Sequence, residues 1–313
     1  MDWIDRATRR VKLRDLHMLM AVAEAGSMSK ASERLAVSHP VVSKTISDLE
    51  RTLGVRLFDR ASHGVEPTAY GQALLQCGAA VFDAMRQGIK QIEYLDDPTT
   101  GELRIGCPDI ITAGLLPTII ERFSRDYPKV RFHVIHVANT AVMQVHELRN
   151  RNVEILFART PKGIADNDLI VETLFDEPFV LVAGAQSKWA RRRRLDLRDL
   201  VEERWVLPPY DSVPGRLILE IFRSAKLQPP MQSMATLSVQ LTTNLIATGA
   251  YIGILPRSVA QYTQRVGLKI LPARLSNQRL ALGIITLKNR SLGPLASLFL
   301  DRTRKVVAPF QHM

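Results

Sequence analysis

The feature that most constrains the fold is a set of three short helical patterns in the first sixty residues, separated by brief turns. In each pattern apolar residues return every three or four positions, so they lie on one face of a helix. Gly26 follows the first pattern and Gly54 the third, and glycine favours a helix end because it adopts the left-handed conformation at little cost. The three patterns predict a compact helical unit. Its expected core residues are Leu16, Leu19, Met20 and Ala23, then Met28, Ala31 and Leu35, then Val42, Ile46, Leu49 and Leu53.

The third pattern begins after Ser38 and carries a polar outer face. Ser38 is the expected N-cap, and Pro40 falls in the first turn, where its missing N–H is not needed. A helix fits the major groove of DNA, side chains in its first turns reach base edges, and a hairpin over 57–67 would follow as a wing. The spacing alone leaves two alternatives, DNA binding and a small packing unit whose polar face meets water. The outward-facing side chains are His39, Ser43, Lys44, Ser47 and Arg51.

The net charge of +11 does not by itself locate a nucleic-acid interface. Residues 1–97 hold 13 basic and 13 acidic side chains, whereas residues 98–313 hold 29 basic and 18 acidic ones. A basic surface attracts nucleic acid in general, but here the excess lies outside the helical unit. An argument for DNA binding by that unit therefore depends on local geometry. The run Arg191–Arg194 is interpreted as a solvated loop or helix start, with an added contact to DNA or to another subunit as the alternative.

Three consecutive stretches resemble the LysR-type transcriptional regulators. They are VAEAGSMSKASERLAVS (Val22–Ser38), SHPVVSKTISDLERTLGVRLFDR (Ser38–Arg60) and PTAYG (Pro67–Gly71), in the order that the family shows. The resemblance implies a winged helix-turn-helix over residues 1–67 that binds double-stranded DNA. His39 stands where glutamine is common in the family. This changes the expected base preference, because glutamine pairs bidentately with adenine and imidazole does not.

The resemblance also implies roles for single residues of this unit, carried over by position. One set would face the major groove, and another would contact phosphates or the minor groove. The groove-facing set is Ser38, His39, Pro40, Ser43 and Lys44, and the second set is Ser29, Lys30, Arg60 and His63.

A long helical pattern follows from Thr68 to about Leu95. Its apolar residues recur in two interleaved seven-residue series, a spacing typical of coiled coils, although two glycines weaken the helix by ~1 kcal/mol each relative to alanine. An amphipathic helix that lies on its own domain is the alternative. The resemblance implies a linker helix over residues 68–97 through which subunits pair, in a homo-oligomer built as a dimer of dimers. The expected pairing residues are Leu74, Val81, Met85, Ile92 and Leu95.

Residues 98–313 alternate short apolar strands with helical patterns, after the helix-breaking stretch Asp96–Gly101. Such alternation implies parallel sheets covered by helices. The resemblance implies a two-lobed α/β effector domain like the periplasmic binding proteins, so the fold class is α/β overall with an all-α N-terminal unit and a long linker helix. The expected bounds are about 101–160 and 274–313 for the first lobe and about 161–273 for the second, with crossings near 158–161 and 271–274.

In open α/β sheets a ligand binds beside the C-terminal ends of strands and the helix N-termini there. By resemblance, the loop that leads from Asp109 to the helix with Pro117 lines an effector cleft between the lobes. The family often has serine or threonine where Ile110 stands, so Thr112 is a candidate substitute, and a ligand of different chemistry is the alternative. The expected effector-binding residues are Asp109, Ile110, Ile111, Thr112, Asn139, Thr140, Pro208, Tyr210, Thr248 and Gly249.

Several classes of protein are excluded by what the sequence lacks. No stretch of ~18 apolar residues and no signal core are present, so a membrane span is excluded and a cytoplasmic protein is expected. Cys77 and Cys107 are too few for a disulfide framework. His133, His136 and His146 lack a metal-ligand spacing, and no nucleotide-binding or nucleophile motif occurs, so no metal, cofactor or catalytic residue is expected.

The sequence therefore predicts a transcriptional regulator whose DNA bending or activation responds to a small-molecule effector. Its expected partners are double-stranded DNA, the effector and further copies of the chain, with RNA polymerase as an additional candidate. Two alternatives remain, an enzyme that uses the two-lobed domain and an architectural DNA-binding protein that needs no ligand.

Overall fold

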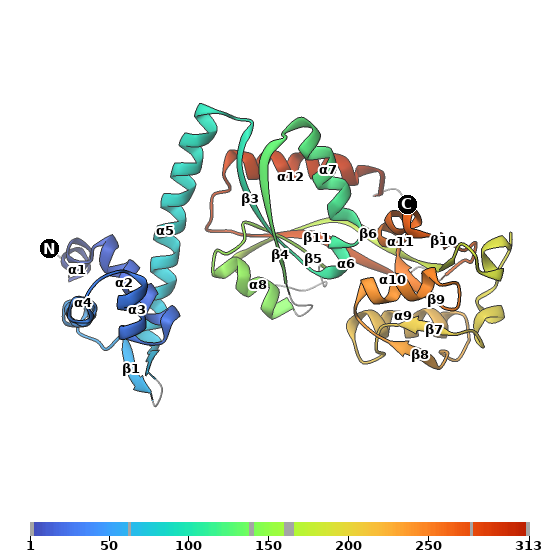
Figure 1. The fold of residues 1–313 in the computed structure, drawn as a ribbon, viewed down its shortest axis with the longest axis horizontal. Coiled ribbons are helices and arrows are strands. Elements are labelled where there is room, and N and C mark those ends of the chain that lie inside the picture. Colours follow the sequence, from blue (N-terminus) through green and yellow to red (C-terminus); the bar gives the residue numbers. More distant parts are fainter. Residues whose placement is uncertain (1–2, 62–63, 138–140, 160–165, 276–277, 311–313) are drawn as a thin grey trace. The chain divides into compact units, whose positions relative to one another are not determined.

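The structure is a computed structural model that describes residues 3–61, 64–137, 141–159, 166–275 and 278–310. The chain forms two compact units, Met1–Ile89 and Lys90–Met313, which divide inside the long helix α5 (Figure 1). Each unit has its own hydrophobic core. The domain boundaries that the sequence suggests at residues 67 and 97 remain predictions.

The first unit contains the three helices that the periodicity predicts. They are α2 (Leu13–Ala25), α3 (Met28–Arg34) and α4 (His39–Leu53), preceded by α1 (Trp3–Arg10) in the charged stretch before them. Gly26 and Gly54 end α2 and α4 with φ angles of 63° and 72°. The predicted apolar stripes meet in one core. Its most buried residues include Leu19, Val22, Ala31, Val42 and Ile46.

The wing consists of β1 (Phe58–Ala61) and β2 (Gly64–Pro67), paired antiparallel. The carboxylate of Glu50 holds its start to α4, because Oε1 accepts a hydrogen bond from the Leu57 N–H at 2.8 Å. Leu57 also contacts the start of α5. A Cβ on Gly71 would lie 2.0 Å from the Leu57 carbonyl oxygen. Only glycine fits there, which explains the last residue of the PTAYG stretch.

The helix α5 (Ala69–Asp96) begins at a side-chain cap, since Thr68 Oγ1 accepts a hydrogen bond from the Gly71 N–H at 3.0 Å. Its first half packs on its own unit. Leu74 joins the core of that unit, and Gly78 lies against Met20. For this half, the alternative of a helix lying on its own domain is therefore the correct one.

The second unit is built on one nine-stranded sheet in the order β4-β3-β5-β11-β6-β9-β7-β8, with β10 paired to β6. Strands β3, β4 and β5 run parallel, as do β7, β8 and β9, but β6 and β11 run antiparallel to their neighbours. The sheet is thus mixed, and the prediction of parallel sheets holds only at its two ends. The bounds are β3 (Thr100–Cys107), β4 (Lys129–His136), β5 (Ile155–Arg159), β6 (Leu169–Gly184), β7 (Trp205–Leu207), β8 (Gln232–Ala235), β9 (Ile252–Pro256), β10 (Leu268–Ile270) and β11 (Arg279–Leu287).

The chain crosses between the lobes later than the sequence predicts. Strand β6 pairs with β11 in the first lobe as far as Pro178 and with β9 in the second lobe from Phe179 onward. The first crossing therefore lies near residue 178, not at 158–161, because the first part of β6 is partly exposed and its polar Glu172 and Asp176 interrupt the apolar pattern of a strand. The second crossing lies beyond Ala273, which still bridges to the second lobe, rather than at 271–274.

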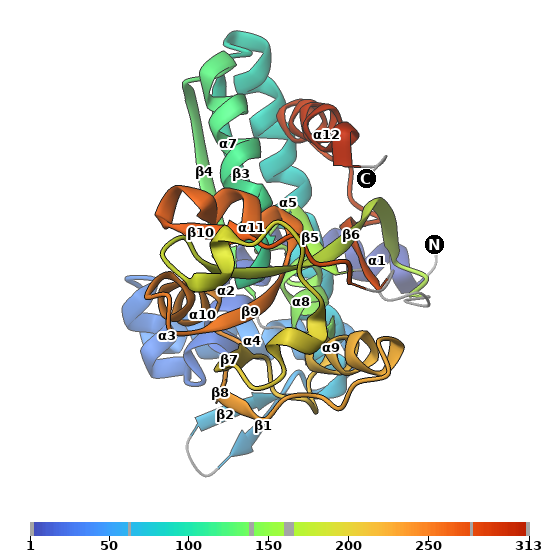
Figure 2. The ribbon, with the colours of Figure 1, turned by 90° about the vertical axis from the view of Figure 1, so that its right-hand side faces the viewer.

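Helices cover both faces of each lobe. In the first lobe α7 (Leu115–Asp126) and α12 (Pro294–Val307) lie side by side on one face, and α8 (Ala141–Arg149) covers the other (Figures 1 and 2). In the second lobe α9 (Val213–Ser224) packs on one face, and α10 (Val239–Ala247) and α11 (Arg257–Thr263) pack on the other. The short elements are α6 (Asp109–Thr112), η1 (Lys188–Arg191), η2 (Leu197–Leu200), η3 (Gln264–Val266) and η4 (Ala308–Phe310).

Candidate functional site

The start of α4 presents an exposed polar surface on the first unit. Ser38 is the N-cap residue, but its side chain makes no capping hydrogen bond to the helix. The first N–H groups of a helix carry partial positive charge and bind phosphate oxygens. Pro40 has no N–H and the Val41 N–H donates to the Ser38 carbonyl at 3.0 Å, so of the first three residues of α4 the His39 N–H is left for an external anion. Of the predicted groove-facing set, Ser38, His39, Pro40 and Lys44 are exposed and Ser43 is half-buried.

The residues predicted at phosphates lie on α3 and the wing. Ser29 and Lys30 are exposed in the first turn of α3, which packs against α4. Arg60 lies in β1, paired with Val65, and His63 falls outside the described residues. The described members of both sets therefore belong to the helix-turn-helix and the wing.

The turn between α3 and α4 contains a strained residue that sequence patterns do not reveal. Ala36 has a φ of 52°, in the left-handed region, which costs a residue with a Cβ roughly 1–2 kcal/mol. Its N–H donates to the Glu33 carbonyl at 3.2 Å, and the Val37 N–H donates to the Ser32 carbonyl at 3.0 Å. These bonds fix the turn that delivers the chain to Ser38. A glycine would have signalled the position, and the sequence has alanine.

The predicted pairing residues of α5 fall into two groups. Leu74 packs in the core of the first unit, and Val81 is half-buried. The remaining residues lie toward the C-terminal end of the helix, where apolar side chains are exposed at intervals of three or four. Such a stripe is typical of a helix face that packs against a partner. The exposed residues are Met85, Ile89, Ile92 and Leu95, at 45%, 55%, 69% and 76%.

In the second unit Asp109 reaches from the first lobe to the second. Its Oδ2 accepts a hydrogen bond from the Val239 N–H, the first residue of α10, at 3.1 Å. Ser238 Oγ accepts another from the Leu241 N–H at 3.2 Å, so this helix start has two internal acceptors. Thr112 is also engaged internally, since its Oγ1 donates to the Asp109 carbonyl at 2.7 Å. The predicted ligand-facing loop therefore contacts the protein itself.

The two isoleucines of this loop are packed rather than open. Ile110 lies against the cores of both lobes, and Ile111 is only 2% exposed in the core of the first. The packing accounts for an apolar residue at Ile110 where the family often has a hydroxyl. It also leaves the Ile111 side chain without access to a ligand. Asn139 and Thr140 fall outside the described residues.

Pro208 and Tyr210 follow β7, at the edge of the sheet where its C-terminal end lies. The Tyr210 hydroxyl donates to the Pro230 carbonyl at 2.9 Å, and burial raises the pKa of Tyr210 to about 12. At neutral pH this phenol is therefore a neutral hydrogen-bond donor that is already used.

Thr248 and Gly249 lie at the opposite edge. They follow α10 and precede β9, which runs parallel to β7, so they adjoin the N-terminal ends of both strands. The residues that share the edge with Pro208 are those after β9, including Ser258. The structure therefore does not bring Thr248 and Gly249 together with Asp109.

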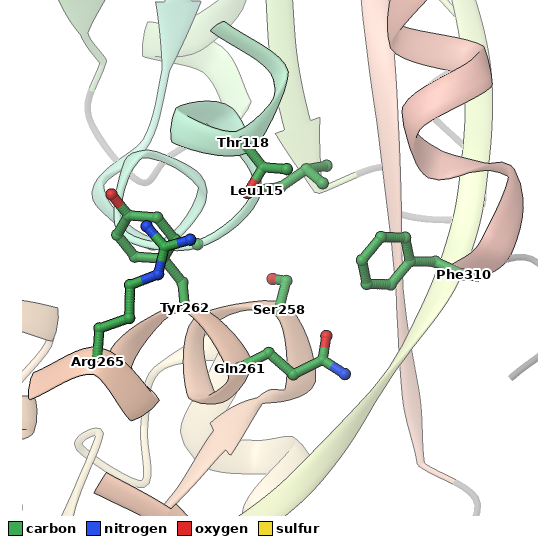
Figure 3. A pocket seen from close by; sticks show the side chains of 8 residues that line it. Leu115, Thr118, Ser258, Gln261, Tyr262, Arg265 and Phe310 are labelled. Carbon is green, nitrogen blue, oxygen red and sulfur yellow. The ribbon is translucent and has the colours of Figure 1, made fainter. Parts of the chain in front are cut away.

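A cavity of about 150 Å³ lies between α7 and α11 (Figure 3). None of the predicted effector-binding residues that the structure describes lines it. Its residues come from four separate elements and form no motif, so the sequence does not reveal it. The lining residues are Gly114, Leu115, Thr118, Ser258, Gln261, Tyr262, Arg265 and Phe310.

A buried ion pair supports this cavity from behind. The carboxylate of Glu177 accepts a hydrogen bond from the Ser258 N–H at 2.7 Å and lies 3.0 Å from Nη2 of Arg159. Glu177 is 2% exposed, and burial lowers the pKa of Arg159 while the carboxylate opposes that change. The pair joins the end of β5 to the crossing strand β6 and to the start of α11.

Metal and membrane signatures are absent from the part of the chain that the structure describes. No group of three or more His, Cys, Asp or Glu side chains there could hold a metal ion. No helix among these residues combines the length and apolar character needed to cross a bilayer. Cys107 is fully buried, and burial raises the pKa of its thiol, which makes it unreactive.

Comparison with known proteins places both units in one family. Residues 13–72 match the bacterial regulatory helix-turn-helix proteins of the lysR family, and residues 96–308 match the LysR substrate binding domain. The transcriptional dual regulator GltC of Bacillus subtilis is 28% identical over 93% of this chain and 96% of its own. The regulator GbpR of Azospirillum brasilense is 26% identical over 97% of this chain and 88% of its own.

Solved structures share the fold at low sequence identity. CbnR, a LysR family transcriptional regulator, has a TM-score of 0.63 at 22% identity, over 95% of this chain and 99% of that one. Full-length OxyR from Pseudomonas aeruginosa has a TM-score of 0.65 at 19% identity, over 95% of each chain. The predicted fold class, a helical DNA-binding unit followed by a two-lobed α/β domain, is confirmed. The chain belongs to the LysR family of bacterial helix-turn-helix transcriptional regulators.

Proposed function

We propose that this regulator reads its DNA site with the start of α4 and that a small molecule held by the second unit controls the outcome. The observation that carries the proposal is that one face of α4 is buried in the core while the residues at its start are exposed on the other face. Val42, Ile46 and Leu49 fix the helix in the core, while Ser38 and Lys44 are exposed at its first turns. A helix anchored in this way presents its N-terminal residues to the major groove.

Within this surface the side chains have different tasks. For Lys44 we propose a phosphate contact beside the groove in place of the base contact that the resemblance implies, so its charge sets affinity and salt dependence. His39 offers a single ring nitrogen to a base edge, in contrast to the two-point contact that an amide makes with adenine. Lys44 therefore positions the protein, and His39 contributes to the choice of sequence.

The exposed stripe of α5 supports pairing of two copies. CbnR, which shares the fold, has been solved in complex with its target DNA. Two paired copies would present two α4 helices to half-sites about one turn of DNA apart, or a multiple of it. Met85 and Ile92 would lie at the centre of the contact.

The contact between Asp109 and Val239 offers a route for effector control. It joins the two lobes directly, so a ligand bound between them changes the free energy of this contact. A ligand shifts such an equilibrium only as far as its affinities for the two states differ, typically by ~1–3 kcal/mol of coupling.

DNA binding is tested by fluorescence anisotropy with duplex fragments from beside the gene. Lys44→Ala should weaken binding and lower the slope of log affinity against log salt by about one. Arg51→Ala is the matched control, because Arg51 is exposed on the same helix but at its far end and pairs with Asp48. Equal behaviour of the two variants, or no preference of the wild type for any fragment, would contradict the proposal.

Pairing is tested by sedimentation velocity. Met85→Asp places a charge in the proposed contact and should shift the protein to a smaller oligomer. Gln91→Asp adds the same charge on the same helix at an exposed polar position and should leave the oligomer intact. An unchanged profile for Met85→Asp would remove this stripe from the contact.

A further inference from the structure

The cavity between α7 and α11 has the size of a small-molecule site. A cavity of about 150 Å³ accommodates a molecule as large as benzene. Side chains from separate elements point into the same space: Thr118 and Leu115 from α7, Ser258 and Gln261 from α11, and Phe310 from η4 (Figure 3). The residues that line it do not include the loop Asp109–Thr112 or any other predicted effector-binding residue that the structure describes.

The hydroxyl of Ser258 points into this space and is not used by the protein. Ser258 is 7% exposed, and its backbone N–H is bound to Glu177, but in the described part of the chain no hydrogen bond engages its Oγ. Thr118 and Gln261 likewise have polar ends in the cavity that bond to no other described residue. Thr118 is half-buried and Gln261 is exposed, whereas Ser258 is nearly buried. Because a nearly buried polar group is normally paired, the unused Ser258 hydroxyl is the one that indicates a ligand in this space.

The charge around the cavity selects an anion. Arg265 stands at its rim, with Cζ 5.5 Å from the ring centroid of Tyr262, and pairs with no carboxylate among the described residues. Among the residues that the structure describes, no acidic side chain lines the cavity. A guanidinium with free donors recognises carboxylates through charge-assisted hydrogen bonds.

The opposite wall of the cavity is apolar. Leu115 is 2% exposed, and Phe310 is held in place by stacking on Phe175, with ring centroids 5.4 Å apart and an interplanar angle of 27°. Gly114 lets the start of α7 approach α11, since a Cβ on it would lie 2.9 Å from Ser258 Oγ. The wall therefore suits the apolar body of a ligand whose charged end faces the rim.

We propose that this cavity binds a small organic carboxylate, with its charge at Arg265, its oxygens near Ser258 and Thr118, and its apolar body against Leu115 and Phe310. Because α7 belongs to the first lobe and α11 to the second, the ligand touches both. A regulatory role for this site rests on the proposed effector function. Binding of a ligand to the cavity is measured without DNA, however. A cavity that binds no ligand is therefore distinguishable from a ligand that binds but does not control DNA binding.

Calorimetry or ligand-observed NMR on the full-length protein tests the site, with phenylacetate and 3-methylbutanoate as an aromatic and a branched aliphatic probe. At least one of them should bind saturably, about tenfold or more tightly than its uncharged amide, as expected for a lost charge-assisted contact. Arg265→Gln should abolish this preference for the carboxylate. Arg204→Gln is the matched control, because Arg204 stacks on Tyr251 in the same way, at 5.4 Å, outside the cavity.

A second variant keeps the test independent of charge. Thr118→Phe fills the cavity and should remove binding of acid and amide alike, while circular dichroism and DNA binding verify that the protein is folded. The proposal is overturned if neither probe binds at concentrations up to about 20 mM, which would fill a site of millimolar affinity. It is equally overturned if acid and amide bind alike, or if both Arg265→Gln and Thr118→Phe bind as the wild type does.

Discussion

The starts of α4 and α10 share a local design but differ in what they leave open. Each helix has a serine as its N-cap residue. At α4, Ser38 makes no capping hydrogen bond and is exposed. At α10, Ser238 caps the Leu241 N–H, and the Asp109 carboxylate from the other lobe accepts a hydrogen bond from Val239.

The difference shows how the same backbone element serves two purposes. An open helix start attracts an external anion such as a DNA phosphate. A helix start that already holds an internal carboxylate ties two parts of the protein together, and an external ligand must compete with that carboxylate. The start of α11 is a third, more deeply buried case, because Glu177 occupies it and also pairs with Arg159.

The largest expected effect is on the buried contact at α11. Glu177→Ala leaves the Arg159 guanidinium buried without its partner, so we expect the free energy of unfolding of the second unit to fall by about 3–5 kcal/mol. Glu172→Ala is the control on the same strand, since Glu172 pairs with Arg304 at a partly exposed position and its loss should cost about 1 kcal/mol or less. Denaturant unfolding measures both. Similar losses of unfolding free energy in the two variants would mean that the buried pair of Glu177 and Arg159 stabilises the unit no more than the partly exposed pair does.

The next largest effect is expected when a carboxylate of the protein itself is placed at the open start of α4. Ser38→Asp places a carboxylate at the N-cap of α4, where the partial positive charge of the helix start favours it and where it repels a phosphate. We expect DNA affinity to fall about 100-fold, equivalent to about 2.7 kcal/mol, while the stability of the first unit stays equal or rises. Ser38→Thr keeps a hydroxyl and should bind nearly as the wild type. Unchanged affinity in Ser38→Asp would separate this helix start from the phosphates.

The sequence was sufficient to predict the first unit because local signals coincide there. The apolar spacing located α2, α3 and α4, glycines marked two helix ends, and the motif residues lie on the elements that the resemblance implied. What it could not give was the strain at Ala36, since alanine is not a turn signal, or the division of α5. Heptad spacing is the same whether Leu74 packs on its own unit or Met85 faces a partner.

In the second unit the sequence predicts the alternation of strands and helices, but it does not predict how the strands connect. Glu172 and Asp176 interrupt the apolar pattern in the first part of β6, so the sequence predicts the lobe crossing too early. Thr248 and Gly249 lie at the opposite edge of the sheet from Pro208 and Tyr210, because the edge depends on strand direction, which local sequence does not encode. The cavity at Ser258 and Arg265 depends on the approach of α7 to α11, which is a property of tertiary packing.

A smaller effect is expected at the start of α10, where the Asp109 carboxylate joins the two lobes. Asp109→Ala removes the acceptor of the Val239 N–H, at a partly buried position, and should lower the stability of the second unit by about 1 kcal/mol. Asp109→Asn keeps an acceptor oxygen without the charge, so it should recover part of this loss. The pair of variants is compared by thermal unfolding. An identical loss in both would indicate that charge, and not the hydrogen bond, holds the contact.

The smallest effect concerns the turn that delivers the chain to the open start of α4. Ala36→Gly removes the Cβ from a left-handed residue, which relieves strain but adds freedom to the unfolded chain, so a net gain of about 0.5–1 kcal/mol is expected. Ala36→Val should lower stability, because a branched side chain tolerates this conformation less well. Both are measured as shifts of the unfolding midpoint of the first unit. If Ala36→Gly also leaves DNA affinity unchanged, the strain belongs to the connection alone, and the open helix start owes its function to the N–H groups and side chains of α4.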